Sequence, residues 1–127
     1  MSAGSILGRI GAALLLAPLV GCSQGDPSPR WAGFGGDADR GAILIGRESC
    51  GDCHVIPGVE GAAGQVGPPL TQFARRTMVA GLLPNTPDNL VRWLKNPQAV
   101  TPGNAMPNAD LTDQQARDIA AYLYQLK

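Results

Sequence analysis

Two cysteines and a histidine form the stretch of this sequence whose residue types and spacing define a specific covalent chemistry. Cys50 and Cys53 are separated by two residues, and His54 follows directly. Thiols at this spacing can bond both vinyl groups along one edge of a porphyrin, while the adjacent histidine reaches the iron beneath the ring. The stretch therefore predicts covalent attachment of one haem c, with His54 as a metal ligand.

Three other kinds of site also use closely spaced cysteines. A structural zinc site normally needs four Cys or His ligands, whereas the chain has 3 Cys and 1 His, and Cys22 has a separate explanation. A thioredoxin-type dithiol requires a βαβ unit, but the residues flanking the motif are rich in Gly and Pro. A structural disulfide stays open for an exported protein. Haem attachment is the favoured interpretation.

The other face of the iron needs a ligand other than histidine, because His54 is the only one in the chain. Methionine, water, lysine or an open position remain. Met106 lies in a loop bounded by Pro and Gly, where an apolar side chain has no helix face to join, whereas Met78 is expected to fill the core. Met106 is therefore the predicted second metal ligand. Thioether ligation raises the reduction potential, which favours an electron carrier over an oxygen activator.

The composition predicts one small domain that depends on a cofactor. The chain has 127 residues, with 10 basic and 10 acidic side chains, 17 Gly and 11 Pro. The neutral balance argues against nucleic acid or a polybasic membrane patch. A domain this small and rich in loops buries little apolar surface and needs an internal staple, which a haem would supply.

The first 21 residues predict an export signal. Their apolar run, Ile10–Val20, has 11 residues, fewer than the roughly 20 needed to span a bilayer. Residues 19–22, Leu-Val-Gly-Cys, resemble the lipobox of bacterial lipoproteins. The resemblance implies lipid attachment at Cys22 and stable tethering by a diacylglyceryl group. The alternative is a plain secretory signal that leaves Cys22 as a free thiol.

The rest of the chain predicts a flexible tether followed by a helical domain. Residues 22–36 are rich in turn formers, and Trp31 and Phe34 within them can pack on the domain or on a partner. Residues 37–127 predict three helices with long loops at 55–70 and 97–111, and no alternation typical of a sheet. The predicted helices begin at the caps Asp37, Thr86 and Thr112, the last in a capping box with Gln115. In the first helix, Ile43 and Leu44 are expected to face the core.

These features together resemble the class I c-type cytochromes, the fold of mitochondrial cytochrome c. The resemblance covers about residues 37–127 and rests on Cys-x-x-Cys-His, Gly67-Pro68-x-Leu70, the loop from Asn96 to Met106 and the terminal helix. It implies a small all-α fold of three to five helices and long loops around one covalent haem.

The resemblance also implies roles for single residues. The Pro68 carbonyl would accept a hydrogen bond from the His54 ring and so orient it. The other implied positions are Arg76 near a haem propionate, Trp93 as a buried aromatic beside Met106, Asn104 near the haem edge, and Gly41 at the crossing with Ile119 or Tyr122.

A narrower resemblance, over residues 76–106, is to the haem-c domain fused to subunit II of caa-type haem–copper oxidases. No copper-binding domain or transmembrane hairpin precedes the cytochrome in this sequence, so the expectation is electron delivery rather than an oxidase subunit. The predicted function is a lipid-anchored carrier of single electrons between a quinol-oxidising complex and a terminal oxidase or reductase. It would face the periplasm or the outer side of a bacterial membrane. The alternatives are a docked subunit of a respiratory complex or dehydrogenase, and a haem sensor or peroxidase with an open sixth position.

Overall fold

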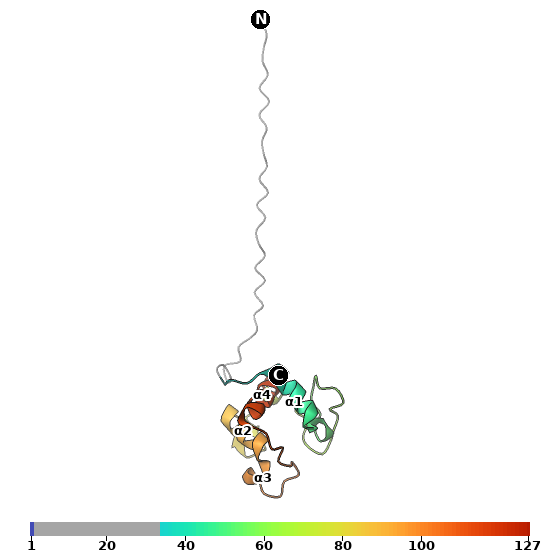
Figure 1. Cartoon of the computed structure of the whole chain (residues 1–127), viewed down its shortest axis with the longest axis vertical. Helices are drawn as coiled ribbons and strands as arrows, with labels where there is room; N and C mark the ends of the chain where they lie inside the picture. Colours follow the sequence, from blue (N-terminus) through green and yellow to red (C-terminus); the bar gives the residue numbers. More distant parts are fainter. Residues whose placement is uncertain (2–33) are drawn as a thin grey trace.

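Helices and the loops between them make up the domain (Figure 1). The computed structural model describes Met1 and residues 34–127, so the predicted signal, Cys22 and Trp31 lie outside the described residues. Its α-helices are α1 (Ala38–Arg47), α2 (Pro87–Lys95), α3 (Pro97–Val100) and α4 (Asp113–Leu123), and its short 3₁₀ helices are η1 (Cys50–Asp52) and η2 (Phe73–Arg75). The predicted all-α class is confirmed.

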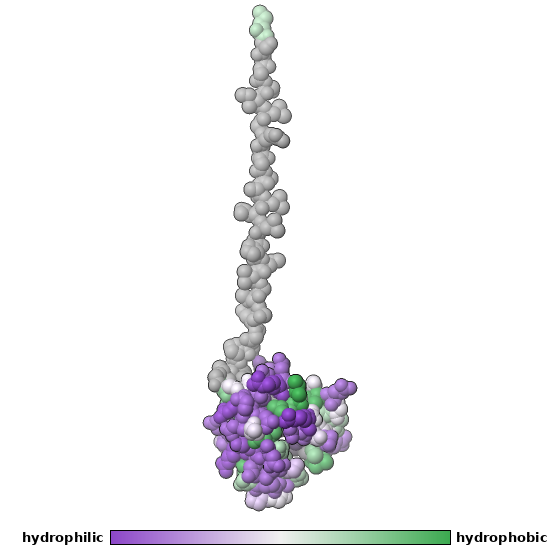
Figure 2. Space-filling view, in the orientation of Figure 1, coloured by the Kyte–Doolittle hydropathy of each residue, from purple (hydrophilic) through white to green (hydrophobic). Residues whose placement is uncertain are grey.

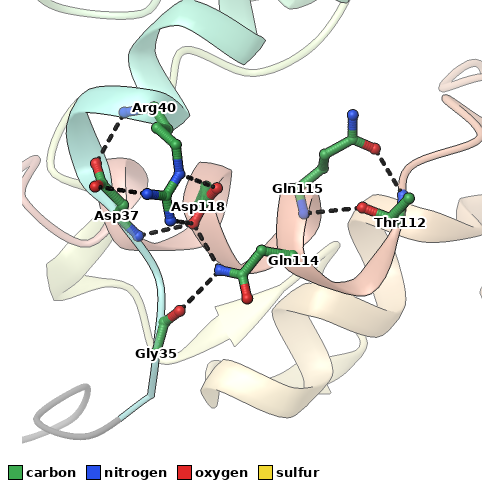
Figure 3. Close-up of polar contacts among 7 residues, drawn as sticks. All are labelled: Gly35, Asp37, Arg40, Thr112, Gln114, Gln115 and Asp118. Atoms are coloured by element: carbon green, nitrogen blue, oxygen red, sulfur yellow. Dashed lines mark hydrogen bonds and ion pairs between the residues drawn. The ribbon is translucent and has the colours of Figure 1, made fainter.

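Side-chain caps fix the starts of three helices where the sequence predicts them. Asp37 and Thr86 each accept a hydrogen bond from the backbone N–H three residues further on. Thr112 does the same for Gln115, whose side chain in turn accepts from the Thr112 N–H (Figure 3). Each bond satisfies an N–H that has no partner within the first helical turn. The predicted starts of α1, α2 and α4 are therefore confirmed.

The first and last helices cross at a glycine. A Cβ atom on Gly41 would lie 3.0 Å from the Tyr122 Cβ and would also meet the Asp118 carbonyl. Because glycine lacks that atom, α1 and α4 can approach closely, and the predicted crossing is confirmed. The core beside this crossing is apolar, and its members on α1, α2 and α4 are Leu44, Ile45, Leu90, Val91, Leu94, Ala116, Ile119, Ala120 and Leu123.

Two residues predicted to be buried are exposed instead. Ile43 is 72% exposed, because the face of α1 that meets α4 is set by Gly41, and the positions three and four further on are Leu44 and Ile45. The prediction for Ile43 was therefore wrong, whereas that for Leu44 is confirmed. Met78 is 40% exposed, so it is not a core residue either.

A short hairpin explains the exposure of Met78. Strands β1 (Met78–Val79) and β2 (Leu83–Pro84) pair antiparallel, with Met78 opposite Pro84. Successive side chains of a strand point to opposite faces, and Val79 is the one that is buried. Strands of two residues have no alternation to detect, so the sequence did not predict them. Helix α3 was also missed, because it occupies one turn of the predicted loop 97–111.

Two side chains of α4 hold the residues just before α1. Arg117 donates to the Phe34 carbonyl at 3.3 Å, with its guanidinium carbon 4.9 Å from the centre of the Phe34 ring. Gln114 donates to the Gly35 carbonyl at 2.8 Å, as Figure 3 shows. Phe34 thus packs on the domain, one of the two roles that the sequence left open for it.

The described residues expose few large apolar side chains. Hydrophilic residues predominate on the face seen in Figure 2, and hydrophobic residues form small groups. Within the described part of the chain, no helix has both the length and the apolar character needed to cross a bilayer.

Candidate haem site

The predicted attachment residues lie together on one turn directly after α1. Cys53 and His54 both donate their backbone N–H to the Cys50 carbonyl, at 3.3 and 3.0 Å. Both thiols are half-buried and neither forms a disulfide. Burial raises the pKa of the Cys50 thiol, which favours its protonated form. One tight turn therefore presents two thiols and an imidazole at the spacing that attachment to a porphyrin edge requires.

The His54 ring is oriented by backbone groups of the following loop. Its Nδ1 lies 2.8 Å from the Pro68 carbonyl oxygen, the contact that the family resemblance implies. A carbonyl can only accept, so Nδ1 carries the hydrogen and the Nε2 lone pair is available to a metal. Such a partner fixes the tautomer and the ring orientation of a ligating histidine.

A glycine makes room for this ring. A Cβ on Gly67 would lie 2.6 Å from His54 Nδ1 and 2.8 Å from its Nε2, so any other residue would displace the imidazole. The Gly67 N–H donates to the Cys53 carbonyl at 2.8 Å, which holds the glycine against the motif. The Gly67-Pro68 pair therefore places and orients the histidine.

The predicted loop 55–70 folds back on the motif. Gly64 donates to the Gly51 carbonyl at 2.9 Å, and Leu70 donates to that of Val55 at 2.8 Å. Ile56 is 2% exposed and anchors the loop to the core. These contacts give the loop a fixed shape beside the two cysteines.

The Met106 backbone is held by two amide side chains. Its N–H donates to Asn104 Oδ1 at 2.7 Å, and its carbonyl accepts from Gln98 Nε2 at 2.8 Å. Gln98 also bonds the Asn104 carbonyl and the Gly103 N–H. Asn104 uses its amide hydrogens on the carbonyls of Pro97 and Thr101. Hydrogen bonds within the loop therefore hold the segment that carries the predicted second ligand.

Several apolar side chains pack against the core but stay only half-buried. They include Cys50, Leu70, Trp93 and Met106, most of which the sequence assigned to the haem or its surroundings. Trp93 was expected to be buried and is half-buried. A flat apolar group would cover such surfaces, so the residues present fit a haem.

Arg76 lies next to the histidine segment. Its Nη2 donates to the Pro69 carbonyl, and its guanidinium carbon lies 5.5 Å from the centre of the Phe73 ring. The sequence predicted a haem propionate as its partner, which stays a prediction. Its contact with Pro69 places the guanidinium one residue from the carbonyl that orients His54.

Three residues of this region were not predicted from the sequence. Gln98 holds the Met106 loop, and Asn85 and Tyr124 form a buried pair behind Arg76. Their partners are mostly backbone carbonyls, which leave no mark on the local sequence pattern. The caps Thr86 and Thr112 were predictable because both partners lie within one helical turn.

Comparison with known proteins gives the family. The sequence model of the family described as Cytochrome c matches residues 38–127, so the chain belongs to the cytochrome c family. It is a class I c-type cytochrome, an electron carrier with one covalently bound haem c.

Solved structures of cytochromes c2 have the same fold. Cytochrome c2 from Rhodobacter sphaeroides has a TM-score of 0.52 and 25% sequence identity, covering 72% of this chain and 96% of that one. Cytochrome c2 from Paracoccus denitrificans has a TM-score of 0.53, covering 71% of this chain and 95% of that one, and its 20% identity supports the fold alone.

Curated relatives are longer proteins named cytochrome c oxidase subunit 2. The protein of Alkalihalophilus pseudofirmus is 36% identical over 91 residues, which are 71% of this chain and 26% of that protein. The protein of Bacillus subtilis is 34% identical over 94 residues, with the same two coverages. The chain therefore spans about a quarter of the length of these relatives.

Proposed function

We propose that Cys50 and Cys53 hold the haem through thioether bonds and that His54 and Met106 ligate its iron. The contact between His54 Nδ1 and the Pro68 carbonyl carries this proposal, because it leaves Nε2 as the metal-binding nitrogen. When bound, the haem supplies an iron centre that gains and loses one electron. The protein's part is to hold the imidazole and the Met106 loop in fixed positions, which limits rearrangement when the charge on the iron changes.

The ligation is tested by the optical spectrum of the oxidised protein. Methionine bound to ferric iron gives a weak absorption band in the red, and we expect Met106→Ala to abolish it. The matched control is Met78→Ala, since Met78 lies on the exposed hairpin. Loss of the band in the Met78 variant and its survival in the Met106 variant would move the ligand to Met78.

The protein would act as a lipid-anchored carrier that delivers electrons to a terminal oxidase. Support comes from its similarity to proteins named cytochrome c oxidase subunit 2, which extends over 71% of this chain. A lipid on Cys22 would keep the carrier near membrane partners and raise its effective concentration without any new contact. Contacts between redox partners are typically small and weak, so tethering would matter.

Electron delivery is tested with the full-length protein and membranes that contain a terminal oxidase. We expect the reduced, lipidated protein to be oxidised quickly in the presence of oxygen. This oxidation should stop when the oxidase inhibitor cyanide is added. The Cys22→Ser variant should react more slowly at equal concentration and should lack lipid by mass spectrometry. Absence of any oxidation by the membranes would contradict the proposed function.

A permanently docked subunit is the second candidate, favoured by the name shared by the curated relatives. A free carrier and a docked subunit differ in which other proteins are extracted from the membrane together with this one. Mild detergent would release a carrier alone, whereas a subunit would copurify with stoichiometric companions. The haem-to-protein ratio of the purified fraction decides between them.

A further inference from the structure

A buried asparagine uses the amide nitrogen of its side chain to bond one turn of the chain. Asn85 is 6% exposed, and its Nδ2 donates to the carbonyls of Phe73 at 3.2 Å and Arg76 at 2.9 Å. Its Oδ1 accepts from the Tyr124 hydroxyl at 2.9 Å. An asparagine amide has two donor hydrogens, so both are used on the turn that contains η2.

The C-terminal end of α4 supports the same turn. Tyr124 is completely buried, at 0% exposed, and its ring centre lies 5.9 Å from that of Phe73. The Ala74 N–H donates to the Leu126 carbonyl at 2.9 Å. The position of this turn therefore depends on residues about 50 positions later in the chain.

From this turn, two further contacts lead to the predicted iron ligand. The Arg76 side chain donates to the Pro69 carbonyl. The neighbouring Pro68 carbonyl accepts from His54 Nδ1 at 2.8 Å. A path of hydrogen bonds and short stretches of backbone thus leads from Tyr124 to His54, although one residue follows the turn in the sequence and the other precedes it.

We propose that Asn85 and Tyr124 are positioning residues for the haem: they hold the turn that carries Arg76, and Arg76 holds the Pro68–Pro69 segment that orients His54. Removal of Asn85 takes one donor from each of two carbonyls of this turn; the Phe73 carbonyl keeps its bond from the Arg76 N–H, and the lost donors are replaced only if the turn moves or admits water. A shift of the segment changes the hydrogen bond on His54. Bonds of this kind tune the electronic properties of the iron. The inference rests on the proposed ligation by His54.

A purely structural role would have a different signature. Any loss of a buried hydrogen bond lowers stability, so a reduced melting temperature cannot identify a positioning residue. The reduction midpoint potential responds to the surroundings of the iron and its histidine. Its dependence on Arg76 shows whether the effect travels through that residue, because coupled residues give non-additive effects.

The decisive comparison is between two tyrosines of the same chain end. Tyr124→Phe removes the hydroxyl that bonds Asn85. Tyr122→Phe removes one that donates to the Pro57 carbonyl at 2.6 Å, in a loop without Arg76. The wild-type optical spectrum first tests the ligation itself, so a failure of that proposal is seen separately. Redox titration then gives the midpoint potential of each holoprotein, alone and combined with Arg76→Gln.

We expect Tyr122→Phe, whose lost bond is to the loop 55–70, to have the same effect on the midpoint potential whether or not Arg76 is replaced by Gln, and Tyr124→Phe to shift the potential of the protein that retains Arg76. The shift should disappear when Arg76 is already replaced by Gln. Amide exchange at Arg76, whose N–H bonds the Phe73 carbonyl at 3.1 Å, should become several-fold faster in Tyr124→Phe and stay unchanged in Tyr122→Phe. Asn85→Leu should repeat these effects more strongly. An unchanged potential in both Tyr124→Phe and Asn85→Leu, or an equal shift in the Arg76→Gln background, would overturn the proposal.

Discussion

Asp118 of α4 and Arg40 of α1 form a two-point ion pair across the helix crossing. Arg40 Nε lies 2.9 Å from Asp118 Oδ2, and its Nη2 lies 3.1 Å from Oδ1 (Figure 3). Asp118 is 3% exposed, and its carboxylate also accepts from the Asp37 N–H and the Gln114 amide, at 2.8 and 2.9 Å. It therefore joins α1, α4 and the backbone that precedes α1.

The stability of the protein should depend on pH through this carboxylate. The Arg40 hydrogen bond is the main cause that lowers the pKa of Asp118 from 3.8 to about 2. Because the folded state favours the charged form, the contribution is complete above the unfolded value and is lost as the pH falls from 3.8 towards 2. We expect Asp118→Asn to reduce the free energy of unfolding at neutral pH by roughly 1–3 kcal/mol, and the difference from wild type to shrink in acid.

The control for this prediction lies on the same helix. Asp113 pairs with Lys95 but its side chain is 64% exposed, so Asp113→Asn should lower stability much less than Asp118→Asn does, because solvent screens an exposed pair. Denaturant unfolding of both variants at a series of pH values measures the effect. Equal unfolding midpoints for the two variants at neutral pH would show that the buried pair contributes no more to stability than the exposed pair does.

These contacts mark the limit of what the sequence could predict. The attachment turn and the helix caps were predictable because Cys50, His54, Thr112 and their partners lie within a few residues of each other. Asp118 gave no such sign, since its partner Arg40 is 78 positions away and an acid on a helix normally faces water. Ile43 was misplaced because the face of α1 is chosen by its contact with α4 and not by local hydrophobicity.

The helix crossing provides a second prediction. A methyl group on Gly41 would meet the backbone of Asp118 and the Tyr122 Cβ, so Gly41→Ala should lower the free energy of unfolding by about 1–3 kcal/mol. Gly46 lies on the same helix, and apart from its chain neighbours and the backbone of that helix, no atom of residues 34–127 lies within 4 Å of its Cβ position. Gly46→Ala should therefore raise stability by about 0.5–1 kcal/mol through helix propensity. Urea unfolding compares the two, and a Gly41 variant as stable as wild type would contradict the close packing.

The Met106 loop should loosen when Gln98 is removed. Gln98→Ala loses bonds to Gly103, Asn104 and Met106, each worth about 1 kcal/mol. Under the proposed ligation, an external ligand such as imidazole would displace Met106 at lower cost in this variant, and we expect its affinity for the ferric protein to rise about tenfold or more, since 1.4 kcal/mol corresponds to a factor of ten. Gln125→Ala, at an exposed position near the chain end, is the control. Equal imidazole affinity in the Gln98 variant and wild type would mean that the loop is held by other contacts.

The charges near the predicted haem edge should control reaction with small oxidants. Residues 48–74 and 96–116 contain no Lys or Arg, whereas the acids Asp52 and Asp110 are exposed beside the attachment turn and the Met106 loop. A cationic oxidant, tris(phenanthroline)cobalt(III), should react more slowly as salt is added, and anionic ferricyanide more quickly, because salt screens attraction and repulsion alike.

Two matched double variants separate local from overall charge. Asp52→Asn with Asp110→Asn should flatten both salt dependences measured by stopped flow. Asp39→Asn with Asp88→Asn changes the net charge equally, but these acids lie in the first turns of α1 and α2, so the slopes should stay close to wild type. Equal slopes in the two double variants would mean that net charge alone governs the reaction. If only the Asp52 and Asp110 double variant flattens the slopes, this edge of the molecule would favour a partner with a lysine-rich face, since opposite charges steer the encounter of redox proteins.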